Sequence, residues 1–414
     1  MRRMAPRLDQ PAFLGRHRQD PLIDQVSDVA EWLVDGAPAT SGMDQTLKKL
    51  CDDLCARGVP LWRVGMFVRT LHPDYFGYAW VWRHGADVLV QQGRHSFRTS
   101  DEYLTSPILL IYKTGQPIRQ RLTEPPGPDE LPFFGDLRAE GVTDYLAVPL
   151  AFTDGSLHGI SWSTKAPGGF TDAQLAALQW ITRPLARLAE THTLRHTAGN
   201  ILDTYVGNNA GARILAGQIR RGDADEIRAA IWLSDMRGYT NLSDRLAPQA
   251  IVRVLNDYFD CQVPTILEHG GEVLKFMGDG LLAIFPIAAD DSNIDEVCRR
   301  VLAAARATCS NVDALNAAEG KDLAQELRFG LALHVGEVLY GNIGGAGRLD
   351  FTCIGPAVNL VARLEKVAAQ LGRAVIASAE FAQHCRSEMA ELGEFSVAGF
   401  AAAQTAYGLR DEQT

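Results

Sequence analysis

The chain has 414 residues, of which 46% are hydrophobic and 22% are charged, and this composition excludes a wholly disordered or collagen-like protein. Its length predicts roughly two to three domains. The net charge of -10 argues against nucleic acid as a partner, because nucleic-acid-binding proteins usually carry a basic excess.

Residues 1–20 show little periodicity and are expected to form a flexible tail. The start of the chain is basic, but Pro6 and Asp9 interrupt the apolar core that a signal peptide needs. The longest apolar runs are strand-sized, far below the roughly 20 residues that span a bilayer, so no membrane span is expected. The seven cysteines are scattered without paired spacing, which predicts reduced thiols in a soluble, cytoplasmic protein.

The first half of the chain shows helical and strand patterns in the order of a small sensory domain. Helices are predicted over 22–33 and 43–55, strands over 61–68, 75–82, 145–150 and 158–163, and a long helix after Thr171 or Asp172, either of which can cap it. Four features resemble parts of a GAF domain: Val148-Pro149-Leu150, the Asp154-Gly155 turn, Gly159 in the returning strand and Gly169-Phe170-Thr171. The resemblance implies an α+β regulatory domain over residues 21–190, with an unknown small-molecule or protein input.

Residues 175–222 are predicted to form a helical linker. Four apolar residues recur at intervals of 3, 4 and 3, the spacing of a coiled-coil seam: Leu178, Ile181, Leu185 and Leu188. Pro184 removes one helical hydrogen bond inside this seam, and Gly207-Asn208-Asn209 interrupts a second helical stretch over 201–219. Two interpretations stay open, a signalling linker that pairs two protomers and a plain interdomain helix.

The second half of the chain opens with a buried-strand run over 229–234, followed by Asp235-Met236-Arg237-Gly238-Tyr239-Thr240. A carboxylate at a strand end can ligate a hard cation, and loop amides at the following helix start can face phosphate oxygens. We therefore expect Arg237, Gly238, Tyr239 and Thr240 to contact a phosphorylated substrate. The alternative role of Asp235 is an ordinary helix cap.

Gly278-Asp279-Gly280 lies between two β-type runs and predicts a tight hairpin with a carboxylate at its tip. Asp in such a turn is often only a turn residue. Paired with a second strand-end carboxylate, it can hold two divalent ions that assist an in-line displacement at phosphorus.

Residues 329–344 alternate like a strand that breaks at glycines, and a helix follows with an apolar face formed by Leu360, Leu364, Val367 and Leu371. Asn359 and Arg363 lie four residues apart on another face of this helix. Arg beside Asn suits a phosphate that gains negative charge. The alternative is a solvated polar face without a function.

Taken together, four motifs resemble the catalytic domain of class III nucleotidyl cyclases across residues 224–410. In chain order they are Asp-x-x-Gly-Tyr-Thr from Asp235, Lys-x-x-Gly-Asp-Gly from Lys275, Gly-Asn-Ile-Gly from Gly341, and Ile-Gly-x-x-Val-Asn-x-x-x-Arg from Ile354. The resemblance implies a ferredoxin-like α+β fold in a head-to-tail homodimer with two sites.

The resemblance also implies a role for each matching residue. Asp235, Asp279 and the Met236 carbonyl match the ligands of two Mg²⁺ or Mn²⁺ ions. Lys275 and Thr352 match the pair that reads the purine, Asn359 the residue that orients the ribose, and Arg363 the residue that stabilises the pentavalent phosphate. In this family the metal ligands come from one protomer and the other four side chains from its partner.

The purine-reading pair favours ATP as the substrate, because a Lys donor fits adenine N1, whereas guanine carries N1–H. Guanylyl members of the family resemble this pattern but carry Glu and often Cys at the two positions, so a guanylate cyclase is one alternative function. A catalytically inactive, cyclase-like module is the other. Thr at position 352 resembles the residue choice of a subgroup of this family in which bicarbonate stimulation is sometimes seen. Ala398 stands where a triphosphate-contacting Lys is common, a gap that Arg237 or the metals are expected to fill.

Overall fold

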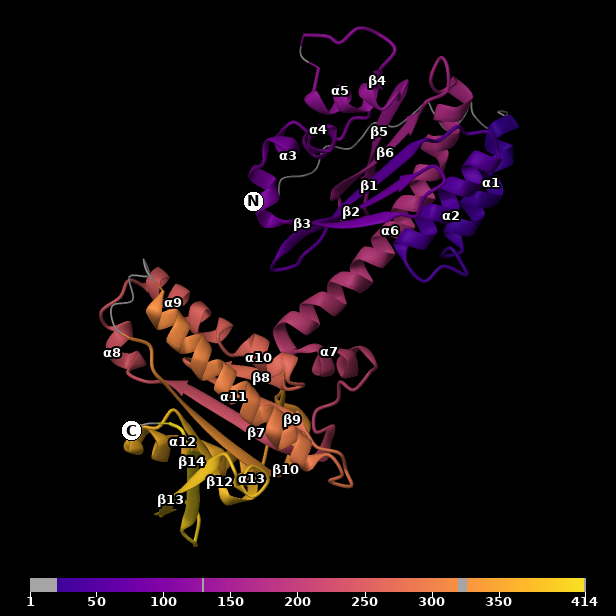
Figure 1. Ribbon diagram of the computed structural model, residues 1–414. Helices are drawn as coiled ribbons and strands as arrows, with labels where there is room; N and C mark the ends of the chain where they lie inside the picture. Colours follow the sequence, from indigo (N-terminus) through magenta and orange to yellow (C-terminus); the bar gives the residue numbers. More distant parts are fainter. Residues whose placement is uncertain (1–20, 129, 319–325, 413–414) are drawn as a thin grey trace. The chain divides into compact units, whose positions relative to one another are not determined.

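The computed structural model describes residues 21–128, 130–318 and 326–412, so the predicted tail over 1–20 lies outside the described residues. The chain divides into two compact units, one ending at Ile201 and one starting at Leu202 (Figure 1). Each unit contains its own sheet with helices on both faces, and each is described separately below.

The N-terminal unit is built on a six-stranded sheet in which every neighbouring pair of strands is antiparallel, in the order β3-β2-β1-β6-β5-β4. The strands are β1 (Arg63–Arg69), β2 (Tyr75–Arg83), β3 (Leu89–Arg94), β4 (Ile118–Arg121), β5 (Asp144–Ala151) and β6 (Leu157–Thr164). The four predicted strands are confirmed as β1, β2, β5 and β6, whereas β3 and β4 were not predicted.

Helices cover both faces of this sheet, and Figure 1 shows the sheet between them. One face packs against α1 (Pro21–Val34), α2 (Met43–Ala56) and the start of α6 (Asp172–Val206). The other face carries η1 (His95–Thr99), α3 (Asp101–Leu104), α4 (Pro107–Thr114) and α5 (Pro132–Ala139). Thr171 caps α6 as predicted, because its hydroxyl accepts a hydrogen bond from the Gln174 amide at 3.3 Å.

The predicted coiled-coil seam on α6 is not exposed for pairing with a second helix. Leu178, Ile181 and Leu185 are fully buried and Leu188 is 7% exposed, all within the core of the N-terminal unit. Heptad spacing and the apolar face of a helix that packs on a sheet share the same period, and here the sheet is the partner. The helix is also continuous to Val206 through Pro184.

The C-terminal unit contains an eight-stranded sheet in the order β13-β14-β12-β10-β7-β9-β8, with β11 paired to β10. Its strands are β7 (Ala224–Met236), β8 (Glu272–Met277), β9 (Gly280–Pro286), β10 (Phe329–Gly345), β11 (Arg348–Ile354), β12 (Val375–Ser378), β13 (Met389–Phe395) and β14 (Gln404–Leu409). The order β10-β7-β9-β8, with helices after β7 and β9, is the β-α-β-β-α-β arrangement of ferredoxin-like folds.

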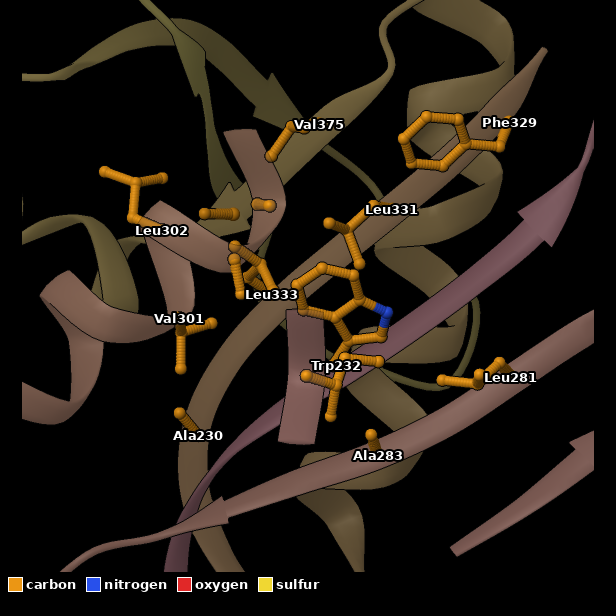
Figure 2. Packing of buried hydrophobic residues seen from close by; sticks show 14 of the residues in the cluster. Ala230, Trp232, Leu281, Ala283, Val301, Leu302, Phe329, Leu331, Leu333 and Val375 are labelled. Atoms are coloured by element: carbon orange, nitrogen blue, oxygen red, sulfur yellow. The ribbon is translucent and has the colours of Figure 1, made fainter. Parts of the chain in front are cut away.

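Two helical layers enclose this sheet. The helices are α7 (Asn208–Leu215), α8 (Tyr239–Ser243), α9 (Pro248–Asp260), α10 (Val263–Glu268), α11 (Ile294–Ala317), α12 (Pro356–Leu371) and α13 (Ala379–Ala382). One face packs against α8 to α11 and α13, and the other against α7 and α12. Figure 2 shows the first core, where Trp232 of β7 lies among Leu281, Leu333 and their neighbours.

Strand β10 is longer than predicted, because it does not break at its glycines but continues to Gly345. Gly341 allows the strand to run close to the start of β7, since a Cβ there would lie 2.2 Å from the Asp223 carbonyl oxygen. Glycine therefore serves a close backbone approach inside the ladder here rather than ending the strand.

The connection between α6 and the C-terminal sheet turns at Gly207, whose φ of +88° lies in the left-handed region. The buried carboxylate of Glu272, at the start of β8, accepts hydrogen bonds from the Asn209 side chain at 3.1 Å and the Ala210 amide at 3.3 Å. The Tyr340 hydroxyl also donates to this carboxylate and lies 2.9 and 2.8 Å from its two oxygens. The first turn of α7 is thereby fixed to the strand that carries Lys275.

Within the described residues, no helix has both the length and the apolar character needed to cross a bilayer. All seven cysteines belong to the described part of the chain, and none of them forms a disulfide.

Candidate functional site

Asp235 and Asp279 lie together at one end of the C-terminal sheet. Asp235 is the penultimate residue of β7, in register with Gly330 of β10. The predicted hairpin is confirmed, with Met277 paired to Gly280 across Gly278-Asp279 and Gly278 at a φ of +71°. Gly280 is adjacent to Asp235, because a Cβ on that glycine would lie 3.2 Å from a carboxylate oxygen of Asp235.

The electrostatics of this pair fit a bound cation. Partial burial raises the pKa of the Asp235 carboxyl to about 6, and the nearby negative charge of Asp279 adds to the rise. Two like charges held in contact destabilise each other unless a cation or a proton lies between them. Mg²⁺ is typically held by one or two carboxylates together with substrate phosphates, so the donor set matches. Among the described residues no larger group of acidic, His or Cys side chains offers a complete metal cage.

The residues of the loop after Asp235 differ in what surrounds them. Gly238 has a φ of +73° and caps α8, and Thr240 is exposed next to it. Tyr239 instead packs its ring against the core beneath the sheet. The guanidinium of Arg237 is paired with Glu365 of α12 at 2.5 Å, so the position of Arg237 does not support the predicted compensation for Ala398.

Lys275 lies on β8 and Thr352 lies on β11 of the same sheet. Burial raises the pKa of the Cys353 thiol to about 11, and the charge of Lys275 opposes that rise, which places the ammonium group near β11. The Thr352 hydroxyl is buried and has no hydrogen-bond partner within the described residues. A buried hydroxyl without a partner costs roughly 1–3 kcal/mol, which a ligand that offers a donor or acceptor would recover.

Asn359 and Arg363 lie on the solvent-exposed side of α12, as predicted. The opposite side of the helix buries Leu360, Leu364 and Val367 against the sheet. The two polar residues are four positions apart and therefore adjacent on the helix surface. Neither side chain forms a hydrogen bond or ion pair with any other described residue, so both are available to a ligand or a second molecule.

Two buried acidic residues near the candidate site were not predicted, Glu272 and Glu365. A sequence signal existed for Glu365, because it follows Val361 by four positions and so falls on the apolar face of α12. A charged residue on an apolar face requires a partner, and the partner is Arg237. Glu272 gave no comparable signal, since its partners come from α7 and β10, far away in sequence.

Comparisons with known proteins relate the second half of the chain to a family of nucleotide cyclases. The family model described as the adenylate and guanylate cyclase catalytic domain matches residues 224–411. An adenylate cyclase of Anabaena cylindrica is 35% identical over 154 residues, which are 37% of this chain and 30% of that protein. Adenylate cyclase 1 of Rhizobium meliloti (strain 1021) is 29% identical over 155 residues, or 37% of this chain and 23% of that protein.

A solved structure of a bacterial light-regulated adenylyl cyclase is 27% identical, with a TM-score of 0.40 and coverage of 46% of this chain and 93% of that one. The matched region spans less than a third of the length of the two curated relatives.

Proposed function

We propose that residues 224–411, which match the adenylate and guanylate cyclase catalytic domain, convert ATP into 3′,5′-cyclic AMP and pyrophosphate. The observation that carries the proposal is the Asp235–Asp279 pair, two half-buried carboxylates that lie together at a strand end, where burial and the charge of Asp279 raise the pKa of Asp235. Such a pair fits the divalent cations that nucleotide chemistry requires.

In the proposed reaction the ribose 3′-oxygen attacks the α-phosphorus in line with the leaving pyrophosphate. A new O3′–P bond forms, the bond from the α-phosphorus to the bridging oxygen breaks, and the 3′ proton passes to water or a substrate phosphate. Two Mg²⁺ or Mn²⁺ ions, when bound by Asp235, Asp279 and the Met236 carbonyl, supply Lewis acidity for this exchange. Arg363 stabilises the charge that develops on the α-phosphate, and Asn359 orients the ribose.

Base choice is assigned to Lys275 and Thr352. The Lys275 ammonium donates to adenine N1, and the Thr352 hydroxyl accepts from the 6-amino group, which gives that buried hydroxyl the partner it lacks. Guanine offers a donor at N1, so it would leave the lysine unpaired, and ATP is the proposed substrate over GTP.

We also propose that two copies of the chain share each site, with Asp235 and Asp279 from one and Lys275, Thr352, Asn359 and Arg363 from the other. Exposed apolar side chains on β8, β10 and β11 support a second copy as the partner. Phe276 and Met277 are 53% and 43% exposed, and the cross-strand pair Leu339 and Ile354 is 45% exposed at both positions. Large apolar groups exposed at adjacent positions are typical of protein interfaces.

The N-terminal unit is proposed to be a GAF-like regulatory domain that takes a small-molecule or protein input. Its antiparallel sheet with helices on both faces supports a compact sensory domain that folds independently of the catalytic half. The long helix α6 then leads directly from this unit into the catalytic one.

The test is incubation of the purified full-length chain with ATP or GTP and Mn²⁺, followed by chromatography of the products. Cyclic AMP from ATP, lost by at least roughly a hundredfold in Asp279→Ala, is the expected result. Cyclic GMP as the main product would identify a guanylate cyclase. Absence of both products from a folded dimer that still binds nucleotide would identify an inactive cyclase-like module.

A further inference from the structure

Arg237 belongs to residues 235–240, called the metal loop below, and its side chain reaches α12. Its Nη1 lies 2.5 Å from a carboxylate oxygen of Glu365, and its Nη2 lies 3.4 Å from the main-chain oxygen of the same residue. The two side chains are only 24% and 10% exposed, so the contact is largely shielded from water. A shielded Arg–carboxylate pair with two contact points is directional as well as strong.

The path of the guanidinium is fixed by a glycine. A Cβ on Gly330 would lie 1.7 Å from Nη2 of Arg237, so the guanidinium lies directly over this residue of β10. Gly330 is also the register partner of Asp235. The backbone of the loop is held as well, because the Arg237 amide donates to the Arg328 carbonyl at 2.7 Å. Side chain and main chain therefore place Arg237 in one orientation beside the carboxylate pair.

Glu365 connects this contact to the exposed side of α12. It follows Arg363 by two residues, which places the two side chains on nearly opposite sides of the helix. Glu365 is 7% exposed and points inward, while Arg363 is exposed. The charges of both Arg237 and Glu365 act on the Asp235 carboxyl, so the pair lies within electrostatic reach of it.

We propose that Arg237 and Glu365 are positioning residues that tie the metal loop to the helix carrying Asn359 and Arg363, and that Arg237 does not contact the nucleotide. The inference rests on the proposed cyclase function. If the two halves of one chain serve two different sites, this ion pair joins those two sites inside each protomer. A shift of the loop when one site is occupied then moves the helix that serves the other.

The first test is a double-mutant cycle with Arg237→Gln and Glu365→Gln in the full-length chain. Each single variant is expected to lower kcat roughly tenfold with little change in KM, because a small misplacement of reacting groups reduces the rate more than binding. The double variant is expected to be no worse than either single variant, since the two residues act as one unit. Lys366→Gln, at an exposed position of the same helix, is the matched control. Additive losses, or a loss confined to KM, would overturn the proposal.

The second test asks which half of the chain the pair serves. Asp279→Ala chains are mixed with Arg363→Ala chains, so that each heterodimer keeps one intact site, built from the metal loop of the second chain and α12 of the first. Arg237→Gln is then added to the Asp279→Ala chain, whose own metal loop is already inactive. A positioning pair lowers the remaining activity, whereas a direct nucleotide contact leaves it unchanged and refutes the inference.

An activity-independent measurement separates this inference from the proposed function. In amide hydrogen exchange, Arg237→Gln is expected to speed exchange in the first turns of α12, and Glu365→Gln to speed exchange over residues 235–243. Exchange that changes only next to the substituted residue would contradict the link. If the heterodimer without Arg237→Gln is itself inactive, the shared-site proposal fails, while the double-mutant cycle and the exchange result still decide the role of the pair.

Discussion

At the scale of single residues, β8 carries a cationic donor, Lys275, and β11 carries a buried hydroxyl without a partner, Thr352. Replacing them by Lys275→Glu and Thr352→Cys inverts the donor pattern. The ratio of ATP to GTP turnover is expected to shift toward GTP, although the total rate can fall. Product chromatography from an equimolar ATP and GTP mixture measures the ratio. Lys366→Glu controls for the change in charge, and an unchanged ratio in the double variant would show that these residues do not read the purine.

A second residue-scale prediction concerns His158 in the N-terminal unit. Its Nδ1 accepts the Arg69 amide at 3.0 Å, and the ring is 3% exposed. Burial lowers the pKa of His158 from 6.5 to about 4, and the Arg69 charge adds to this, against the opposing charges of Asp154 and Glu190. The neutral ring is therefore favoured by folding, and its contribution to stability is complete above pH 6.5 and decreases as the pH falls toward 4.

The expected size of this loss is on the order of 2 kcal/mol across that interval. His158→Asn keeps an acceptor for the Arg69 amide but cannot titrate. Urea unfolding of the full-length chain at pH 7 and pH 5 is expected to show a smaller drop in unfolding free energy for the variant than for the parent. Equal drops would mean that His158 does not control the acid sensitivity of this unit.

At the scale of elements, the burial of α6 leads to a prediction about stability. It replaces the expectation, based on heptad spacing, that this helix pairs with a second helix. Leu185 is fully buried in the N-terminal core, so Leu185→Asp places an uncompensated carboxylate there and is expected to cost roughly 3 kcal/mol or more. Calorimetry should show an early transition for the N-terminal unit alone. Leu194→Asp, on the same helix but 64% exposed, is the control and is expected to change stability by less than about 0.5 kcal/mol. If Leu185→Asp unfolds like the parent protein, the buried position of Leu185 is contradicted, and an interface between protomers becomes the better explanation of the seam.

The same helix shows why some elements were predictable and others were not. The helical periodicity of apolar residues identifies the apolar faces of α6 and α12. The alternation of apolar and polar residues identifies the strands β1, β2, β5 and β6. Helical periodicity does not identify what packs against that face, so the spacing alone left a paired helix and a plain interdomain helix open, whereas a sheet covers the seam. Likewise, Gly341 was interpreted as a strand break because sequence alone does not show that another backbone passes beside it.

In the candidate site, too, features that follow from local sequence pattern were predictable, and contacts between distant residues were not. Asp235, Asp279, Asn359 and Arg363 were predictable because strand ends, a hairpin tip and one helix face follow from local pattern. The Arg237–Glu365 contact and the Glu272 network join residues 128 and 63 positions apart. Such pairs depend on the topology of the sheet, which local pattern does not determine.

At the scale of the whole molecule, the central prediction is that one chain does not contain a complete site. Asp235→Ala and Arg363→Ala proteins are each expected to be nearly inactive. Mixed in equal amounts and allowed to exchange, half of the dimers become heterodimers with one intact site of two, so activity should recover to about a quarter of the parent value. Demonstrated subunit exchange without recovery would place all of the catalytic residues within a single chain.

The distribution of the cysteines gives the molecule an internal reporter of how its two halves open. Cys51 and Cys55 lie in the N-terminal unit, and the other five, Cys261, Cys298, Cys309, Cys353 and Cys385, lie in the C-terminal one. Five of the seven are buried, and burial raises the pKa of Cys298 and Cys385, to about 12 and about 11, so these thiols react slowly while the chain is folded. Each opening event exposes a characteristic number of thiols to an alkylating reagent. Cys55 and Cys309 are only partly buried, so opening newly exposes one thiol in the N-terminal unit and four in the C-terminal one. Intact mass spectrometry of a labelling time course therefore counts additions of one or of four, and reports the opening rate of each half in the same sample.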